Sequence, residues 1–440
     1  MTLLRQPTLP LPEPLRAAER NTFTHTSVVK RLPDIARRVL AENKLPPEAA
    51  AAIQALIAEI PAGTIRAVAA AAAGEECLPA QDCCGDAWAQ WAAPYLGMDW
   101  LEVPWFFAEE YFYLRVLEAT GYFQPGPWQG RDPYAGQKRL GLESTRARQA
   151  ALAEQTGAAL LRPRGTFRES LERLLLVDLW GNQNDLSMWP VSSSANGGGQ
   201  SPNGQSPAGQ SPADSTEAHI LDNHLPAVLA YFDQFGPGAG ARVDILLDNA
   251  GYELVTDLAL ADFLLQSGYA AQVVLHAKCH PVFVSDALET DIFDTLDFLC
   301  FLGTTPARDL AVRLRRALLE ERLVLRRHPF WTSPLPAWEM PPDLLDRLNG
   351  CHLLISKGDA NYRRLLGDRH WELHTPFEKV VDYLPCAVLA LRTLKSEIAV
   401  GILPEAAPAQ DERWMINGGW GVVQFSAPRV DSPQTGQMPL

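Results

Sequence analysis

Two acidic segments in the second half of the chain could bind a divalent metal ion. Asp248 and Asn249 follow the apolar run VDILL, and Ser285 and Asp286 follow the later run AQVVLHA. Carboxylate and amide oxygens are ligands that hard cations such as Mg²⁺ and Mn²⁺ prefer. About one strand–helix–strand unit separates the two segments, which is the spacing that brings neighbouring strand ends together. Helix capping is the competing interpretation, because Asp, Asn and Ser are favoured N-cap residues.

Two basic segments further along the chain are suited to an anion such as phosphate. The run CHLLIS leads into Lys357, Gly358 and a helix-like stretch that carries Arg363 and Arg364. A glycine turn at a strand end directs backbone N–H groups at an anion, and an arginine can bind two of its oxygens at once. The run CAVLALR leads into the second basic segment, RTLK. An ordinary turn with solvated basic side chains is the alternative interpretation.

The elements that must position these residues are short apolar runs that alternate with helix-like stretches. The runs are VDILLD, AQVVLHA, FLCFLG, CHLLIS and CAVLALR, and the helical patterns are ELVTDLALADFLLQSG, PARDLAVRLRRALLEERL and PDLLDRLNG. Such alternation is typical of an α/β fold with a Rossmann-like, doubly wound sheet covered by helices. Ligands bind beyond the carboxyl ends of the strands in such sheets, so the residues after each run are the candidates for a site.

The first part of the chain has a different texture and is predicted to be helical. The segments RLPDIARRVLAEN, PEAAAAIQALIAEI and WFFAEEYFYLRVLEAT carry apolar residues at three- and four-residue spacing. Within the last of these, Glu109 and Glu110 could reach a site, but exposed or helix-capping positions are expected for them. We therefore predict a helical region over residues 1–170, an α/β catalytic domain over 171–425 with a disordered GQSP-rich insertion at 192–215, and a flexible tail at 426–440.

Composition limits the classes of protein to consider. The 440 residues are 47% hydrophobic and carry a net charge of −14, which argues against nucleic acid or an anionic membrane as a partner. No apolar stretch approaches the roughly 20 residues of a membrane span. The seven cysteines are scattered and fit a reducing compartment, so a cytoplasmic protein is expected. His276, Cys279 and His280 lack the second ligand pair that a zinc site requires.

Three motifs in a fixed order resemble the damage-control phosphatase family, once called a domain of unknown function. They are DNAGYE, KGDANYRRLLGD and RTLK, and the resemblance extends from FTHTSVVKRLPDIARRVLAEN to NGGWGVVQF. It is strongest to the subfamily that includes acidic residue methyltransferase 1-like proteins. The resemblance implies a helical N-terminal part on a Rossmann-like domain. It also implies activity on sugar phosphates such as fructose 1-phosphate, supported by Mn²⁺, Ni²⁺ or Co²⁺, with Mg²⁺ as a further candidate.

The resemblance also implies roles for individual residues. Asp248, Asn249 and Asp286 would coordinate the metal and form the catalytic centre. The residues implied to contact the substrate are Asp248, Asn249, Asp359, Ala360, Asn361, Tyr362, Arg363 and Lys395.

The function expected from these residues is metal-dependent hydrolysis of small phosphorylated metabolites. The nucleophile is either a water molecule or the Asp248 carboxylate, which would form an aspartyl-phosphate. A carboxyl methyltransferase that uses S-adenosylmethionine is the second hypothesis; a glycine-rich loop would support it, but the position after the first run reads Asp-Asn-Ala-Gly. A non-catalytic protein that binds phosphorylated metabolites is the third.

Overall fold

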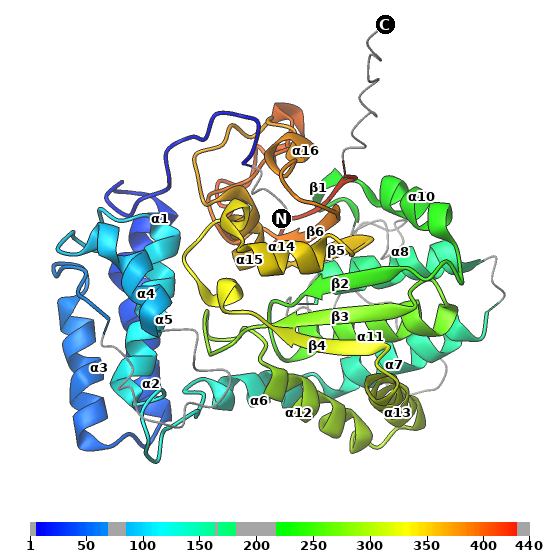
Figure 1. Cartoon of the computed structure of the whole chain (residues 1–440), viewed down its shortest axis with the longest axis horizontal. Helices are drawn as coiled ribbons and strands as arrows, with labels where there is room; N and C mark the ends of the chain where they lie inside the picture. Colours follow the sequence, from blue (N-terminus) through cyan, green and yellow to red (C-terminus); the bar gives the residue numbers. More distant parts are fainter. Residues whose placement is uncertain (1–5, 69–84, 163–165, 182–216, 429–440) are drawn as a thin grey trace, which may run out of the picture.

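The computed structural model is built around a seven-stranded β-sheet (Figure 1). It describes residues 6–68, 85–162, 166–181 and 217–428. The strands are β1 (Ile220–Asn223), β2 (Arg242–Leu246), β3 (Gln272–Ala277), β4 (Leu323–Arg327), β5 (Leu353–Lys357), β6 (Ala387–Thr393) and β7 (Gly421–Ser426).

The order of the strands brings the predicted site segments to one edge of the sheet. The order is β1-β7-β6-β5-β2-β3-β4, and the five strands from β6 to β4 run parallel to one another. Strand β7 is antiparallel to β6, and β1 is parallel to β7. Because β6, β5, β2 and β3 are neighbours, the segments that follow their carboxyl ends lie next to each other.

Helices cover both faces of the sheet. One face packs against α7 (Arg146–Leu160), α8 (Phe167–Leu179), α10 (Leu225–Phe235), α11 (Tyr252–Ser267), α12 (Glu289–Cys300) and α13 (Thr305–Leu319). The other packs against α14 (Pro342–Leu348), α15 (Gly358–Leu366) and α16 (Phe377–Val380). Alternate side chains of one strand enter the two cores: Ala387 and Leu389 on one side, Val388 and Ala390 on the other. Burial on both faces explains the continuous apolar runs of the sequence.

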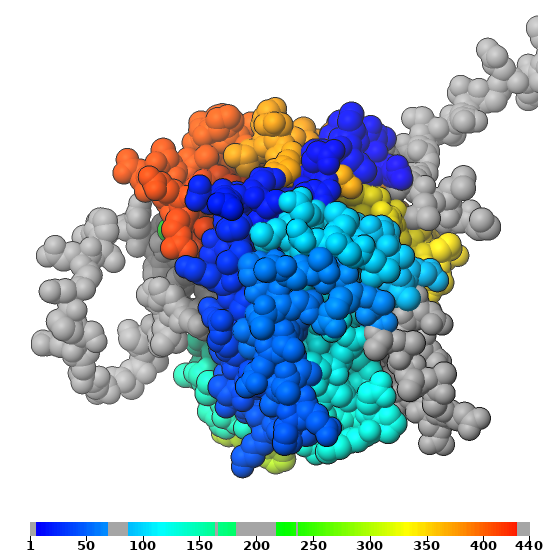
Figure 2. Space-filling model, turned by 90° about the vertical axis from the view of Figure 1, so that its left-hand side faces the viewer, coloured from blue at the N-terminus to red at the C-terminus, as the bar shows by residue number. Residues whose placement is uncertain are grey.

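A helical N-terminal region lies beside the sheet (Figure 1). It contains α1 (Phe23–Thr26), the π-helical turn η1 (Ser27–Arg31), α2 (Leu32–Glu42), α3 (Pro47–Glu59), α4 (Gly85–Ala92), α5 (Trp105–Thr120) and α6 (Ala135–Ser144). One short 3₁₀ turn belongs to this region, η2 (Ala93–Tyr95). Three others lie in the second half of the chain: η5 (Pro329–Thr332), η6 (Ala337–Glu339) and η7 (Pro404–Ala406). Figure 2 shows the blue N-terminal residues against the orange segment from the end of the chain.

The predicted fold class, an α/β sheet covered by helices with a helical N-terminal region, is confirmed. One predicted strand is wrong, because FLCFLG forms the end of α12 and the turn after it. Strand β4 was not predicted; it begins at Leu323, the last residue of the stretch PARDLAVRLRRALLEERL that was expected to be helical. The GQSP-rich insertion at 192–215 and residues 429–440 of the predicted tail lie outside the described residues. The division at residue 170 stays a prediction; α7 and α8 both pack against α11.

Within the four described ranges, no helix is long and apolar enough to cross a lipid bilayer.

Candidate active site

Backbone hydrogen bonds join the two predicted metal-binding segments. The Ala250 N–H donates to the Ser285 carbonyl at 2.7 Å, and the Ala287 N–H donates to the Asp248 carbonyl at 2.7 Å. These bonds form an isolated antiparallel bridge beyond the ends of β2 and β3. The side chains that follow two neighbouring strands are therefore fixed next to each other, as their spacing in the sequence predicted.

Helix capping does not explain these acidic residues. Helix α11 begins at Tyr252 after the N-cap residue Gly251, and no side chain caps it. The N-cap residue of α12 is Leu288, whose N–H donates to the Asp291 carboxylate at 2.8 Å, so neither Ser285 nor Asp286 caps this helix. The capping interpretation is wrong for both segments.

The amide of Asn249 links Asp248 and Ser285 to Glu253 on α11. Its Nδ2 donates to Asp248 Oδ2 and, at 2.9 Å, to Glu253 Oε2. Its Oδ1 accepts a hydrogen bond from the Ser285 hydroxyl. Asn249 is thus held in one orientation, and a second lone pair on Oδ1 remains for another ligand.

Lys278 is the basic residue closest to the acidic pair. Its Nζ lies 3.3 Å from Asp286 Oδ2 and donates to Asn361 Oδ1 at 2.8 Å. Burial raises the pKa of Asp286 to about 6, although Lys278 opposes the shift. Burial, together with the Glu253 and Asp286 carboxylates, raises the pKa of Asp248 well above its ordinary value. The site therefore concentrates more negative charge than Lys278 neutralises, and a cation would relieve it.

The donor set fits a hard divalent cation. Asp248 and Asp286 are 5% and 1% exposed, and the only partner of Asp286 Oδ2 among the described residues is the Lys278 ammonium at 3.3 Å. In those same ranges no cluster of three or more His, Cys, Asp or Glu side chains is suited to a metal, so the Asn249 amide would have to supply the third protein ligand. All three donors are oxygens, which favours Mg²⁺ or Mn²⁺ over a soft metal.

The acidic pair opens onto a cavity of about 480 Å³. The side chains that line it come from the N-terminal region, the ends of four strands and the loop before β7. They are Phe23, Arg31, Trp105, Asp248, Asn249, Phe283, Ser285, Asp286, Asp359, Ala360, Arg363, Lys395, Ile416 and Asn417.

Only part of the predicted substrate-binding stretch reaches this cavity. Asp359, Ala360 and Arg363 lie on the face of α15 that lines it, as positions i, i+1 and i+4 of a helix do. Asn361 instead bonds to Lys278 and to two backbone carbonyls, and the Tyr362 hydroxyl donates to Gln424 at 2.8 Å. The helical period turns these two side chains into the protein, where they support the site.

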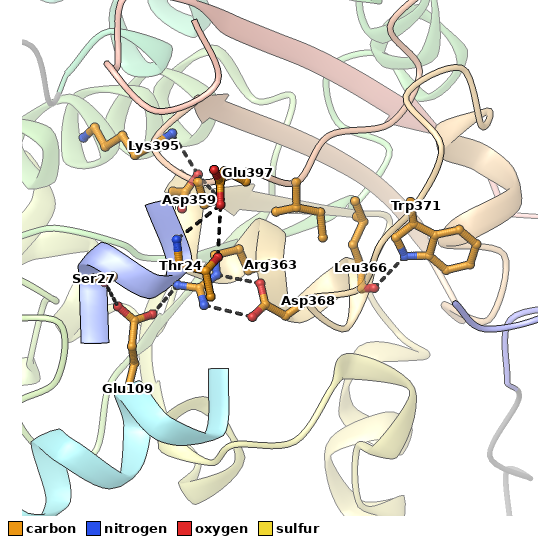
Figure 3. A network of polar contacts seen from close by, with 12 residues as sticks. Thr24, Ser27, Glu109, Asp359, Arg363, Leu366, Asp368, Trp371, Lys395 and Glu397 are labelled. Carbon is orange, nitrogen blue, oxygen red and sulfur yellow. Dashed lines mark hydrogen bonds and ion pairs between the residues drawn. The ribbon is translucent and has the colours of Figure 1, made fainter. Parts of the chain in front are cut away.

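The charges of Asp359 and Arg363 are balanced by neighbours (Figure 3). Asp359 Oδ1 accepts from Arg392 Nε at 2.8 Å and from the Lys395 N–H at 3.1 Å. Although burial disfavours its charge, Arg392 and Arg363 hold the pKa of Asp359 below its ordinary value. Arg363 donates to Asp368 at 2.8 and 3.0 Å and also binds Glu109.

Lys395 presents a cation to the cavity. Its backbone N–H is bound by Asp359, and Figure 3 shows its ammonium end directed away from that carboxylate. No acidic side chain in the described ranges forms an ion pair with the Lys395 ammonium, which is therefore available to an anion in the cavity.

Three basic residues near the strand ends have other roles. Lys357 is buried among Asp178, Asp257 and Glu253, and Arg364 is buried against Glu110. Lys357 and Arg364 do not line the cavity and are not exposed to solvent. For these two residues, both the predicted phosphate contact and the alternative of solvated basic side chains are therefore wrong. Arg392 is equally buried and orients Asp359.

Several residues that shape the site were missed or misjudged. Glu109 and Glu110 were expected to be exposed or to cap a helix, but both are buried within α5. Glu109 lies between Ser27, Arg31 and Arg363, and Glu110 pairs with Arg364. Lys278 gave no local signal, because a lone lysine after a strand resembles a solvated one. For Glu253, the only signal in the sequence was its position as the last residue of the DNAGYE motif.

Comparison with known proteins finds a matching family domain and individual proteins of similar sequence. The damage-control phosphatase ARMT1-like domain matches residues 27–409. The chain is similar to the damage-control phosphatase ARMT1 of Danio rerio, with 34% identity over 349 residues that cover 75% of each chain. It is 32% identical to the protein of the same name from Homo sapiens over 344 residues, which cover 75% of this chain and 76% of that one.

A crystal structure of a DUF89 family protein from Pyrococcus horikoshii is a more distant neighbour. It shares 13% sequence identity and a TM-score of 0.42, and the alignment covers 84% of this chain and 92% of that chain. A likeness this low carries no argument. The domain match over most of the chain and the identity with the ARMT1 proteins suffice, and they show that the chain belongs to the family of damage-control phosphatase ARMT1-like domains.

Proposed function

We propose that the protein is a metal-dependent phosphatase that hydrolyses small phosphorylated metabolites, sugar phosphates such as fructose 1-phosphate among them. The proposal rests mainly on one observation: Asp248, Asn249 and Asp286 line the same cavity as Lys395. The names of the ARMT1 relatives support a phosphatase. The four cysteines in the described ranges are free thiols, which supports our proposal of a cytoplasmic location.

In the proposed reaction, Asp248, Asn249 and Asp286 hold Mn²⁺, Ni²⁺, Co²⁺ or Mg²⁺. When bound, the cation supplies positive charge that offsets the charge on the phosphate oxygens. Lys395 binds a phosphate oxygen, because its ammonium has no other acidic partner in the described ranges. Arg363 lines the cavity, but Asp368 and Glu109 already hold its guanidinium, so we assign it mainly to the positioning of the α15 face.

Water is the nucleophile in this proposal. Its oxygen forms the new bond to phosphorus while the bond from phosphorus to the ester oxygen breaks. One proton of the water is given up and one is taken up by the departing ester oxygen, so the products are an alcohol and inorganic phosphate. Direct attack by the Asp248 carboxylate would instead leave a covalent aspartyl-phosphate, which acid quenching of a working enzyme would trap.

The test is phosphate release from a panel of sugar phosphates after the metal is stripped and each cation is added back. We expect release that depends on the added metal and that Asp248→Asn abolishes, while the exposed control Asp309→Asn retains it. Binding of phosphorylated metabolites without release under any metal would contradict the proposal and favour a non-catalytic binding protein. Methyl transfer from S-adenosylmethionine in the same preparations would favour the methyltransferase hypothesis.

A further inference from the structure

A second cation, Arg31, faces the same cavity from the wall built by the N-terminal region. Arg31 is the last residue of η1 and lines the cavity together with Phe23 and Trp105. Its side chain is 45% exposed, whereas that of Arg363, which also lines the cavity, is 3% exposed. Arg31 is therefore the more accessible of the two guanidinium groups.

The guanidinium of Arg31 is anchored through one of its nitrogens. Nη1 lies 3.2 Å from Glu109 Oε1 and 3.4 Å from Ser27 Oγ. Within the described ranges, Nε and Nη2 make no hydrogen bond or ion pair. A guanidinium has five N–H donors in a planar fork, so this anchor leaves donors free for a planar or tetrahedral anion.

Glu109 fixes the position of Arg31 relative to the α15 face. Figure 3 shows Glu109, on α5, between Ser27 and Arg363. One carboxylate oxygen of Glu109 binds Arg31, and the other binds Arg363, which is held in turn by Asp368. Glu109 is fully buried, so the anchor of Arg31 is a buried carboxylate, while the Arg31 side chain itself stays accessible at the cavity wall.

Besides Arg363, whose guanidinium Asp368 and Glu109 already hold, two cationic side chains line the cavity, Arg31 and Lys395. Lys395 follows β6, and Arg31 belongs to the N-terminal wall, so they come from different parts of the fold. At about 480 Å³ the cavity exceeds the size of one phosphate group and is typical of a site for a whole small metabolite. Phe23, Trp105 and Phe283 add aromatic rings to the lining of this cavity, beside its charged groups.

We infer that Arg31 forms a subsite for a second anionic group of the substrate, a carboxylate or a second phosphate, separate from the phosphate that is removed. The preferred substrates are then phosphorylated sugar acids or bisphosphates rather than neutral sugar phosphates. This inference rests on the proposed phosphatase function and names the substrate class of that site. In this proposal Arg31 determines which substrate is preferred and does not contact the phosphate that is removed.

The experiment compares matched substrates that differ in the second group. One arm uses 3-phosphoglycerate and glycerol 3-phosphate, and the other uses fructose 1,6-bisphosphate and fructose 1-phosphate, all with the metal-loaded enzyme. We expect the wild-type protein to have a higher kcat/KM for the doubly anionic member of at least one pair, and the arm that responds identifies the anion. Arg31→Gln should reduce this preference about tenfold, mainly through KM, as the loss of a charge-assisted contact does. Arg31→Lys should restore part of it.

The control is Arg37→Gln, which removes an exposed arginine on α2 that pairs with Asp34 and does not line the cavity. It should leave the substrate preference unchanged. Equal losses on both members of each pair in Arg31→Gln would overturn the inference, because Arg31 would then act on the transferred phosphate or on the fold. A wild-type enzyme that releases phosphate without preferring the doubly anionic members would also overturn it. Absence of release from all four substrates would reject the phosphatase function itself, and this inference with it.

Discussion

The backbone of Gly358 lies directly against the carboxylate of Asp248. Gly358 follows β5 with φ +76°, and a Cβ atom at this position would stand 1.9 Å from Asp248 Oδ2 and 2.2 Å from its Cγ. No side chain fits in that space, and a positive φ is itself unfavourable for other residues. The backbone at the junction of β5 and α15 therefore limits where the Asp248 carboxylate can lie.

Gly358→Ala should displace Asp248 and reduce metal-dependent phosphate release by at least about tenfold, since even a shift of about 1 Å in a catalytic group is costly. The positive φ should add a loss of about 1 kcal/mol in the free energy of unfolding. Activity assays at several metal concentrations and urea denaturation measure the two effects. Gly97→Ala is the control, because Gly97 has φ +81° but nothing within 4 Å of its added Cβ. Equal activity losses in both variants would show that backbone strain alone is responsible.

Lys357 neutralises a buried acidic cluster, and Lys357→Met should destabilise the protein strongly. Its Nζ lies 2.9 Å from Asp178, 2.8 Å from Asp257 and 3.5 Å from Glu253. Removal of the only partner of a buried charge costs about 3–5 kcal/mol. Urea denaturation should report a loss of that size, and Asp257→Asn in the same chain should recover part of it. Lys379→Met, at an exposed site, should change the free energy of unfolding little.

The position of the site at the carboxyl ends of the strands could be predicted, because the parallel strands are buried on both faces and appear in the sequence as continuous apolar runs. The runs that became β2, β3, β5 and β6 are each followed by the polar residues that form the site. The adjacency of β2 and β3 was predictable from the spacing of Asp248 and Asp286. The run FLCFLG failed because a short apolar run does not distinguish a strand from a helix end; Leu299 is buried, while Phe301 is 84% exposed.

The partners of the charged residues could not be predicted. Arg363 binds Glu109, which lies far away in the sequence, and Glu109 also anchors Arg31. No local pattern indicates such a pairing, because it arises when the N-terminal helices pack on the sheet. For the same reason Lys357 resembled a phosphate ligand in the sequence but is buried among carboxylates.

His280 should make the protein sensitive to acid. Burial lowers its pKa from 6.5 to about 4, so the unfolded chain takes up the proton at a higher pH than the folded one. The protein then loses stability as pH falls from 6.5 towards 4, by roughly 3 kcal/mol over the full window. His280→Gln should make the free energy of unfolding fall less between about pH 7 and about pH 5. The exposed His374→Gln serves as the control, and an unchanged slope in His280→Gln would contradict the assignment.

Glu397 holds the start of the N-terminal helices over the cavity (Figure 3). Its carboxylate accepts from the Phe23 N–H at 2.8 Å, from the Thr24 N–H at 3.2 Å and from the Thr24 hydroxyl at 3.2 Å. A carboxylate at the first N–H groups of a helix is a favourable capping contact, worth about 1 kcal/mol. Because Phe23 lines the cavity, this contact connects the loop after β6 to substrate binding.

Glu397→Ala should therefore loosen Phe23–Thr26 without moving the predicted metal ligands. We expect faster amide exchange in this segment and a several-fold higher KM for phosphorylated substrates, with kcat changed less than KM. Glu397→Gln should have a smaller effect, because its amide oxygen can still accept one of the hydrogen bonds. Glu405→Ala removes an exposed carboxylate from η7 and controls for the loss of negative charge. If kcat falls as much as KM rises, the N-terminal segment supports the reacting groups themselves, and its assignment to substrate binding alone is wrong.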